Sequence, residues 1–171
     1  APIAPPIASL RSQYVHSIII NDKNYIISAY QKANGKDFRS RGIDGKERFI
    51  RIGRSLGKIH QLSKLYTPNN SKKRRQWHES PHIIKAPNIF LKYNSNLQER
   101  LNTYISFMYN FPKNKNSFGL VHGDFLFSNY FIDDSNNITV FDFDECKYSW
   151  FIYDIAVCMY YYLLPGFPKE L

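Results

Sequence analysis

Hydrophobic residues near the amino terminus fall into two short runs rather than a helical repeat. Residues 14–20 and 25–30 are rich in β-branched and aromatic side chains, and the turn-forming residues 21–24 separate them. This pattern predicts a β-hairpin. Residues 31–45 are polar, include three glycines and show no periodicity, so we expect a connector that leaves the sheet.

Hydrophobic residues then recur at steps of three and four. Residues 46–65 carry such a repeat, which lines one face of a helix. A second repeat predicts a helix over residues 94–110, ended by Pro112. Between the two helices we expect a basic loop and a stretch interrupted by prolines.

Short apolar runs return in the last third of the chain. Residues 118–121, 130–132 and 138–141 are typical of strands, with a turn over residues 133–137. A final helix is predicted over residues 150–164, stopped by Pro165 and Gly166. A small sheet, a linker, a helical body and a polar loop on short strands together predict an α+β fold.

The length of the chain allows one domain, or one complete lobe and part of a second lobe of a larger protein. The 171 residues are 43% hydrophobic and 16% aromatic, which is enough apolar material for a packed core. The first residue is Ala1 and not Met, so we expect processing or a piece of a longer chain. Residues 150–167 are apolar, but they contain Asp154 and number only about 18, so we expect a buried helix and no membrane partner.

Charge and cysteine content narrow the possible partners only in part. The net charge of +9 allows nucleic acid, an anionic membrane surface or an anionic small substrate. The basic run at residues 72–75 is interpreted as a solvated loop. Cys146 and Cys158 lack metal-site spacing and are too few for a disulfide scaffold, which favours buried reduced thiols in a cytoplasmic protein. His60 is interpreted as a packing histidine on a helix face.

The densest group of reactive residues has the spacing H-x-D-x-x-x-x-N, followed by an apolar strand and D-F-D. Its members are His122, Asp124, Asn129, Asp142 and Asp144. Phosphoryl transfer needs a carboxylate to orient and deprotonate a hydroxyl, and oxygen ligands to hold Mg²⁺ against the nucleotide phosphates. Asp124 suits the first task, and Asn129 with Asp142 the second.

A hairpin between residues 130–132 and 138–141 would bring these groups together. The midpoint of the hairpin falls at Ser135, and the midpoint of residues 129 and 142 lies between 135 and 136. We therefore expect Asn129 and Asp142 to lie opposite each other, close enough to share one metal ion. Asp124 is expected on the loop that faces the same point.

This group resembles the catalytic loop and metal-binding segment of the aminoglycoside phosphotransferase and choline kinase superfamily, which has a protein-kinase-like fold. Gly123 in place of arginine, and Asp144 in place of the D-F-G glycine, favour this small-molecule branch over protein kinases. Residues 56–60 are similar to the Leu-Gly-x-x-His helix of the family, and residues 153–156 to its Tyr-Asp-Leu-Ala. Residues 33–36 resemble the hinge between its lobes.

The resemblance implies an enzyme that uses ATP and Mg²⁺. Asp124 would be the catalytic base, Asn129 and Asp142 the Mg²⁺ ligands, and His122 and Asp154 supports of the loop. The remaining implied contacts are to adenine through Gln31, Lys32 and Ala33, and to the acceptor through Asp144, Glu145 and Tyr148.

Within the superfamily, the chain resembles a partial kinase. Residues 1–30 would be a remnant of the N-terminal lobe, residues 31–45 the hinge, and residues 46–171 a truncated C-terminal lobe. No G-x-G-x-x-G loop and no phosphate-binding strand lysine precede the hairpin, so we expect weak ATP binding by these residues alone.

The predicted activity is transfer of the γ-phosphoryl group to a hydroxyl of a small molecule of the aminoglycoside, choline or ethanolamine, homoserine or sugar type. Three alternatives stay open. One is an atypical bacterial Ser/Thr protein kinase, another a non-catalytic module that binds nucleic acid through residues 72–75, and the third an inactive relative. The intact set of Asp124, Asn129 and Asp142 favours the small-molecule enzyme over nucleic-acid binding.

Overall fold

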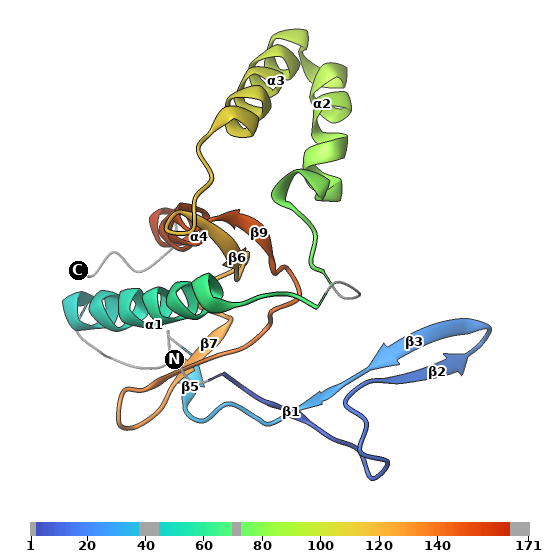
Figure 1. Cartoon of the computed structure of the whole chain (residues 1–171), viewed down its shortest axis with the longest axis vertical. Coiled ribbons are helices and arrows are strands. Elements are labelled where there is room, and N and C mark those ends of the chain that lie inside the picture. Colours follow the sequence, from blue (N-terminus) through green and yellow to red (C-terminus); the bar gives the residue numbers. More distant parts are fainter. Residues whose placement is uncertain (1–2, 38–44, 70–72, 165–171) are drawn as a thin grey trace. The chain divides into compact units, whose positions relative to one another are not determined.

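The computed structural model describes residues 3–37, 45–69 and 73–164. These residues form two compact units (Figure 1). Unit 1 holds the described residues of 1–56 and 126–142, and unit 2 those of 57–125 and 143–167. The mixture of helices and strands confirms the α+β class. The lobe boundaries at residues 30 and 45 stay a prediction. Some residues of the sequence predictions lie outside the described ranges: 38–44 of the connector, Lys72 of the basic run, and Pro165 and Gly166 after the final helix.

The helices and strands alternate irregularly along the chain. In order they are β1 (Pro6–Ile7), β2 (His16–Ile20), β3 (Lys23–Ile27), β4 (Ala29–Tyr30), β5 (Lys36–Asp37), α1 (Gly45–Leu65), the 3-10 turn η3 (Trp77–Glu79), α2 (Pro81–Tyr93), α3 (Ser95–Asn110), β6 (Phe118–Val121), β7 (Tyr130–Ile132), β8 (Ile138–Val140), β9 (Lys147–Trp150) and α4 (Ile152–Leu163).

In unit 1, β2 and β3 form the predicted amino-terminal hairpin. Its turn is tighter than predicted, because Ile20 pairs with Lys23 and leaves only Asn21 and Asp22 between the strands. Both turn residues have positive φ, 49° and 59°, the conformation of a type I′ turn, which Asn and Asp tolerate. Apart from His16, every residue of the two strands is exposed.

The core of unit 1 lies on a second, three-stranded sheet of order β5-β7-β8. Each strand of its β7–β8 hairpin has the burial pattern buried, intermediate, buried, because alternate side chains point to opposite faces. Gly35, just before β5, has a φ of +96°, and a Cβ atom there would lie 2.0 Å from the carbonyl oxygen of Ile132. This glycine therefore permits the close approach of β5 to β7.

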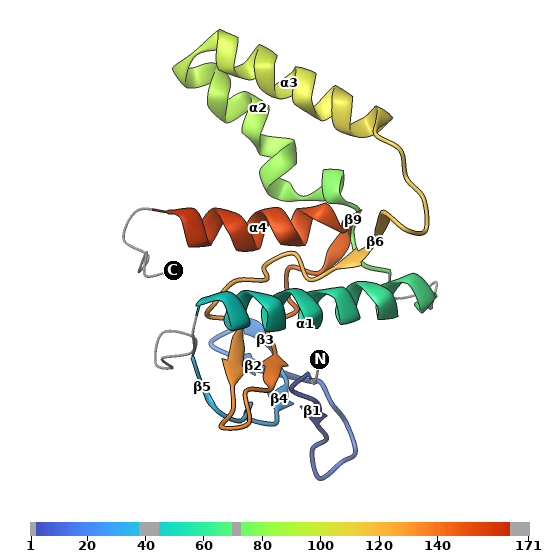
Figure 2. The same cartoon turned by 90° about the vertical axis from the view of Figure 1, so that its left-hand side faces the viewer.

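Unit 2 combines a two-stranded sheet with helices. β6 pairs with β9, a strand that the sequence did not predict, over four residue pairs from Phe118↔Trp150 to Val121↔Lys147. α2 and α3 run beside each other (Figure 2), and α2 fills the stretch expected to be interrupted by prolines. Pro81 occupies its first turn, where a missing N–H is tolerated, while Pro87 lies inside the helix.

The core of unit 2 is aromatic. The Trp150 ring lies 5.6 Å from the rings of Trp77 and Phe111 and 5.2 Å from that of Phe118, and its indole N–H donates to the Pro112 carbonyl. Trp150 is the last residue of β9, so the predicted final helix begins at Ile152, two residues later than expected.

Among the helices within the described ranges, none combines the length and the hydropathy that a membrane crossing would require.

Candidate functional site

The loop that follows β6 is held by one buried carboxylate. Asp154 is 0% exposed, and it accepts hydrogen bonds from the backbone N–H groups of His122, at 3.0 Å, and Gly123, at 2.8 Å. The same carboxylate lies 2.9 Å from Nε2 of His60. A buried charge is tolerated only when it is paired and hydrogen-bonded, so these three partners account for Asp154 in the core.

The position of Asp154 in the chain explains how it reaches the loop. It lies in the first turn of α4, where a negative charge is favoured by the helix dipole. Phe151, directly before α4, donates its backbone N–H to the Ser117 carbonyl and stacks on the His60 ring with centroids 4.6 Å apart. The entry to α4, the end of α1 and the loop after β6 therefore meet at this carboxylate.

His122 and Gly123 shape the loop from inside. Nδ1 of the fully buried His122 accepts the Asp124 backbone N–H at 3.3 Å, so a neutral imidazole carries its proton on Nε2. Gly123 has a φ of +87°, and a Cβ atom there would lie 2.2 Å from the Glu145 carbonyl oxygen. Any other residue at position 123 would push the loop away from the segment that leads into β9.

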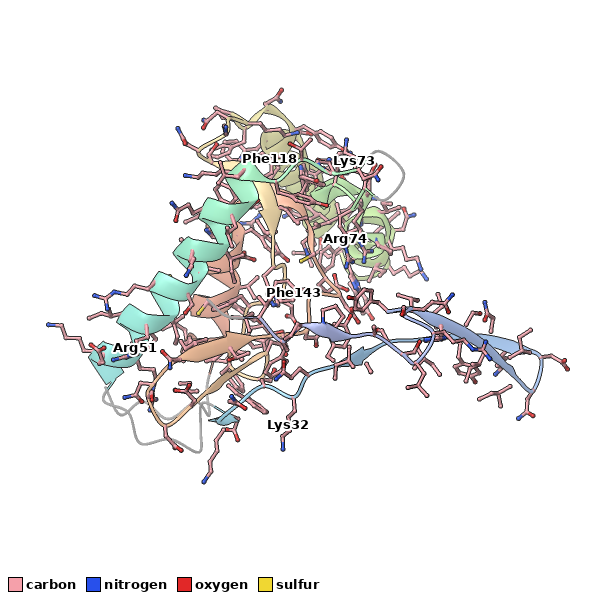
Figure 3. The ribbon with its side chains drawn as sticks, turned by 60° about the horizontal axis from the view of Figure 1, so that its bottom comes forward. Lys32, Arg51, Lys73, Arg74, Phe118 and Phe143 are labelled. Atoms are coloured by element: carbon pink, nitrogen blue, oxygen red, sulfur yellow. The ribbon has the colours of Figure 1, made fainter. Side chains whose placement is uncertain are left out.

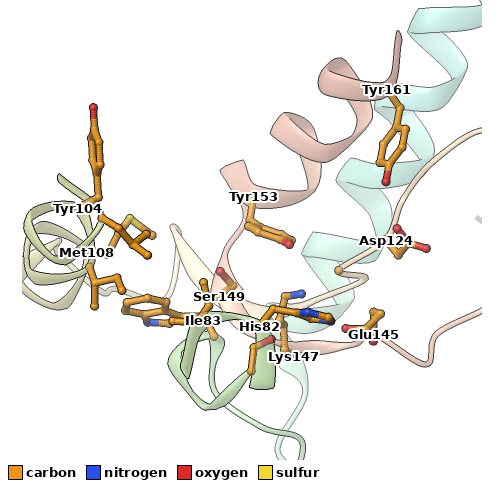
Figure 4. A pocket seen from close by; sticks show the side chains of 15 residues that line it. His82, Ile83, Tyr104, Met108, Asp124, Glu145, Lys147, Ser149, Tyr153 and Tyr161 are labelled. Atoms are coloured by element: carbon orange, nitrogen blue, oxygen red, sulfur yellow. The ribbon is translucent and has the colours of Figure 1, made fainter. Parts of the chain in front are cut away.

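Asp124, the next residue, borders a pocket of about 490 Å³ within unit 2 (Figure 4). The pocket extends from the loop to η3, α2, α3, β9 and α4. Its apolar wall is contributed by Trp77, Ile83, Leu101, Tyr104, Ile105, Met108, Tyr153 and Tyr161. Its polar lining consists of Ser80, His82, Asp124, Glu145, Lys147 and Ser149. A group bound here would lie beside the carboxylate of Asp124, in a loop whose backbone is held by hydrogen bonds to Asp154 and His122.

The three residues predicted to contact an acceptor lie in different surroundings. Glu145 lines the pocket, whereas Asp144 and Tyr148 are not among its lining residues. Strand alternation explains Tyr148: Lys147 and Ser149 face the pocket and Tyr148 takes the other face of β9. Burial raises the pKa of Tyr148 above its usual value. Lys147 and Ser149 are pocket residues that sequence reasoning missed, although the alternation of β9 would have indicated them.

Asn129 and Asp142 belong to unit 1, at the open end of the β7–β8 hairpin. Tyr130 pairs with Val140, and the Phe141 N–H donates to the Asn129 carbonyl at 3.0 Å, so Asn129 lies opposite Phe141 and not opposite Asp142. The predicted pairing is wrong by one residue, because the hairpin turn contains an odd number of residues, 133–137. Asp142 is the first residue beyond Phe141, and its φ is +63°.

The side chains of the two predicted metal ligands differ in exposure. Asn129 is 6% exposed and its Oδ1 accepts a hydrogen bond from the Ser128 hydroxyl, whereas Asp142 is exposed. Among the described residues, no group of three or more His, Cys, Asp or Glu side chains is arranged to hold a metal ion. Since Mg²⁺ commonly takes one or two protein ligands together with waters and phosphates, this pair suits Mg²⁺ in its chemistry. The convergence of Asp124 with the pair stays a prediction.

The predicted hinge residues also lie in unit 1. The Gln31 N–H donates to the Pro5 carbonyl at 2.9 Å, which holds the start of the hinge against the amino-terminal segment. Lys32 is exposed (Figure 3), and Ala33 is buried with 9% exposure. Their contacts with adenine stay a prediction.

The described part of the basic run contacts its own unit. The Arg74 guanidinium donates to the Asp144 carbonyl at 3.0 Å, and the Arg75 guanidinium lies 3.9 Å from the Glu145 carboxylate (Arg74 and Lys73 are labelled in Figure 3). The Arg75 carbonyl accepts the Tyr148 N–H. These two arginines thus contact the segment around β9, while Lys73 is exposed.

Both cysteines are free and buried, in keeping with the predicted reduced thiols. Burial raises the pKa of the Cys146 thiol to about 11, and burial also raises that of Cys158 to about 11. Neither thiol is a thiolate near neutral pH, so we assign neither to the candidate site.

Comparison with known proteins identifies relatives for almost the whole chain. The model of the phosphotransferase enzyme family matches residues 15–169. An amicoumacin kinase from Bacillus subtilis (strain 168) is 30% identical over 161 residues, which are 92% of this chain and 47% of the relative. The chain therefore spans about half the length of this curated relative.

Three solved structures of kinases or phosphotransferases are similar to this chain in fold. A structure of an amicoumacin kinase in complex with AMP-PNP, Ca²⁺ and Ami is 26% identical, with a TM-score of 0.78 over 99% of this chain and 51% of that one. A microcompartment-associated aminopropanol kinase, 18% identical, has a TM-score of 0.67 over 92% of this chain and 52% of its own. A spectinomycin phosphotransferase, 17% identical, has a TM-score of 0.56 over 91% and 51%. The predicted kinase-like fold is thereby confirmed.

Proposed function

The chain belongs to the phosphotransferase enzyme family, and on this premise we propose that its full-length protein transfers the γ-phosphoryl group of ATP to a hydroxyl of a small molecule. One observation carries the proposal. Asp124 borders a pocket of about 490 Å³, while Asp154 holds the two preceding backbone N–H groups in place. A carboxylate at the edge of a preformed pocket can accept the proton of a bound hydroxyl.

Asp124 is the catalytic base in this proposal. Its carboxylate would orient the acceptor hydroxyl and take its proton as the hydroxyl oxygen attacks the γ-phosphorus of ATP. The bond from that phosphorus to the β–γ bridging oxygen would break, and ADP would leave. Because His122 accepts the Asp124 N–H and Asp154 binds the two preceding amides, the loop is arranged before the acceptor arrives. Such preorganisation lowers the barrier, since little reorganisation remains at the moment of transfer. His122 and Asp154 are therefore positioning residues.

Asn129 and Asp142 would hold Mg²⁺, and the backbone of Gln31, Lys32 and Ala33 would contact adenine. When bound, ATP supplies the phosphoryl group, and Mg²⁺ neutralises the phosphate charge. An amide oxygen and a carboxylate near one end of a hairpin are suitable donors for this ion. The complex of one relative with AMP-PNP and Ca²⁺ supports a nucleotide and a divalent cation as cofactors. A cytoplasmic location, where ATP is available and the two free thiols stay reduced, is part of the proposal.

A small molecule suits this pocket better than a protein or a nucleic acid. The names of the relatives describe kinases or phosphotransferases of amicoumacin, aminopropanol and spectinomycin, all small acceptors. Arg74 and Arg75, which a nucleic-acid site would use, contact Asp144 and Glu145 instead. We therefore retain the small-molecule hydroxyl as the acceptor.

The test is the variant Asp124→Asn in the full-length protein, with Asp22→Asn as a matched control in the exposed turn of the β2–β3 hairpin. ADP release is measured with a panel of hydroxyl acceptors, and ATP affinity by calorimetry. We expect Asp124→Asn to lose about 10²–10⁴-fold in turnover with ATP affinity nearly unchanged, and Asp22→Asn to match the wild type. Unchanged turnover in Asp124→Asn would remove the assigned role.

A further inference from the structure

The pocket beside Asp124 combines an apolar wall with buried polar atoms that have no partner. Among the described residues, the indole Nε1 of Trp77 and the hydroxyl of Ser149 are buried without a hydrogen-bond partner, and both residues line the pocket. Buried polar groups are nearly always hydrogen-bonded. Two such groups at one pocket therefore indicate a ligand that completes their hydrogen bonds.

Lys147 adds a charge to this set. It lies on β9 between Cys146 and Tyr148, is only 7% exposed, and lines the pocket (Figure 4). Its ammonium nitrogen lies 4.6 Å from the centroid of the Tyr153 ring. Within the described ranges, no carboxylate forms an ion pair with it. The ammonium group is thus held over an aromatic ring, inside a pocket, without a counter-ion of the chain.

The nearby carboxylates are engaged elsewhere. Glu145, two residues before Lys147, lies 3.9 Å from the Arg75 guanidinium. Asp154 is shared between His60 and the backbone of the catalytic loop. Asp124 is the base in the proposed function, in which its carboxylate faces the acceptor hydroxyl. A charge withdrawn from water requires an opposite charge nearby, and the ring of Tyr153 supplies only part of that stabilisation.

We infer that the acceptor is a hydroxy acid: a molecule with an apolar, ring-sized body whose carboxylate pairs with Lys147 while its hydroxyl faces Asp124. This inference rests on the proposed function and names the substrate class of the same pocket. The carboxylate supplies the counter-ion that Lys147 lacks, and its oxygens suit the donor groups of Trp77 and Ser149. The apolar body packs against Tyr104, Met108 and their neighbours on α3.

The pocket disfavours a polycationic acceptor. Apart from Asp124, Glu145 is the one carboxylate among its lining residues, and Lys147 lies on the same strand. An acceptor with several ammonium groups would meet Lys147 and leave most of its own charges unpaired, a strong basis for discrimination. Lys147 is therefore a specificity-determining residue in this inference.

The test compares two probes of nearly the same shape, the negatively charged 4-(hydroxymethyl)benzoate and the neutral 4-(hydroxymethyl)benzamide. Their affinities for the full-length protein are measured by calorimetry, in the wild type and in Lys147→Met. Lys73→Met, at an exposed lysine, is the matched control. We expect the benzoate to bind at least tenfold more tightly than the benzamide in the wild type and in Lys73→Met, and Lys147→Met to abolish the difference. Equal affinities in the wild type, or no measurable binding of the benzoate, overturn the inference.

Two further variants separate this inference from protein stability and from the proposed function. Lys147→Arg keeps the charge, so it should retain the preference for the benzoate even if Lys147→Met folds poorly. Loss of the preference in a folded Lys147→Arg would count against pairing by charge. Asp124→Asn should keep the preference while losing phosphoryl transfer to the benzoate. If the wild type binds the benzoate preferentially but transfers no phosphoryl group to any acceptor of the hydroxyl panel, the proposed function fails and the carboxylate site stands.

Discussion

The β2–β3 and β7–β8 hairpins of unit 1 have similar local sequences but very different surroundings. Both are antiparallel, both were predicted from short apolar runs, and both turn through residues of positive φ. Yet Ile26 in β3 is 74% exposed, whereas Ile132 in β7 is 1% exposed. The longer hairpin, with five-residue strands, is the uncovered one.

The difference arises from partners distant in sequence. β7 also pairs with β5, and Val140 in β8 accepts the Ala4 N–H and bridges to Ile3. β2 and β3, by contrast, pair only with each other among the described strands. A local pattern of β-branched residues is thus enough to specify a strand, but burial depends on a second layer that the pattern does not encode.

The comparison is tested most strongly by matched truncations, Ile132→Ala in β7 and Ile26→Ala in β3. We expect Ile132→Ala to lower the free energy of unfolding by about 2–5 kcal/mol, because it opens a cavity in the core. Ile26→Ala should cost less than about 1 kcal/mol, because its side chain is already in water. Urea unfolding of the 171-residue chain measures both. Equal costs would contradict the contrast between the hairpins.

A second test addresses the strand that covers the buried hairpin. Gly35→Ala places a methyl group where the Ile132 carbonyl lies and forces a positive φ on alanine, so we expect a loss of about 1–3 kcal/mol. Gly53→Ala in α1 is the control, since nothing lies within 4 Å of its added Cβ atom. That variant should be neutral or gain up to about 1 kcal/mol. Thermal unfolding compares the two, and equal melting temperatures would mean that β5 does not hold β7.

The smallest expected effect is a pH dependence of stability that arises from the two buried cysteines. Burial raises the pKa of Cys146 and of Cys158 from 9.0 to about 11. The folded state therefore keeps both protons between pH 9 and 11 while the unfolded state loses them. This contribution to stability is complete below pH 9 and is lost as the pH rises towards 11.

Unfolding curves at pH 8, 9.5 and 10.5 measure this effect in the wild type and in the double variant Cys146→Ala, Cys158→Ala. The variant provides the baseline for all other groups that titrate in the same range. We expect the wild type to lose more stability than the variant between pH 9 and 11. Parallel losses would show that the thiols are not protected by burial.

Local elements were predictable where the signal was local. The repeat over residues 46–65 corresponds to α1 (Gly45–Leu65), and that over residues 94–110 to α3 (Ser95–Asn110). α2 was missed because its prolines suggest interruption, although Pro81 suits the first turn of a helix. β9 was missed because it has only four residues, Lys147–Trp150, and its partner β6 lies far away in the sequence.

Of the residues that line the pocket, the sequence indicated Asp124 and Glu145 but not Lys147 and Ser149, and it did not indicate the geometry of the group. The spacing around Asp124 indicated phosphotransfer, and the family likeness extended it to Asp154. The contact between His60 and Asp154 joins residues 94 positions apart, and no local pattern signals it. His60 was interpreted as a packing histidine, and the structure adds to its stacking on Phe151 a polar bond to the carboxylate that holds the loop.

The shared carboxylate of Asp154 also has an evolutionary consequence. Because it binds His60 in α1 and the backbone N–H groups of His122 and Gly123 in the loop, a substitution there would remove hydrogen bonds from two other chain segments at once. Neither α2 nor α3 contains a buried residue, so substitutions on the pocket wall that they form cost little stability. If the proposed function holds, descendants of this chain can therefore change their acceptor through substitutions in α2 and α3, while the loop held by Asp154 stays constrained.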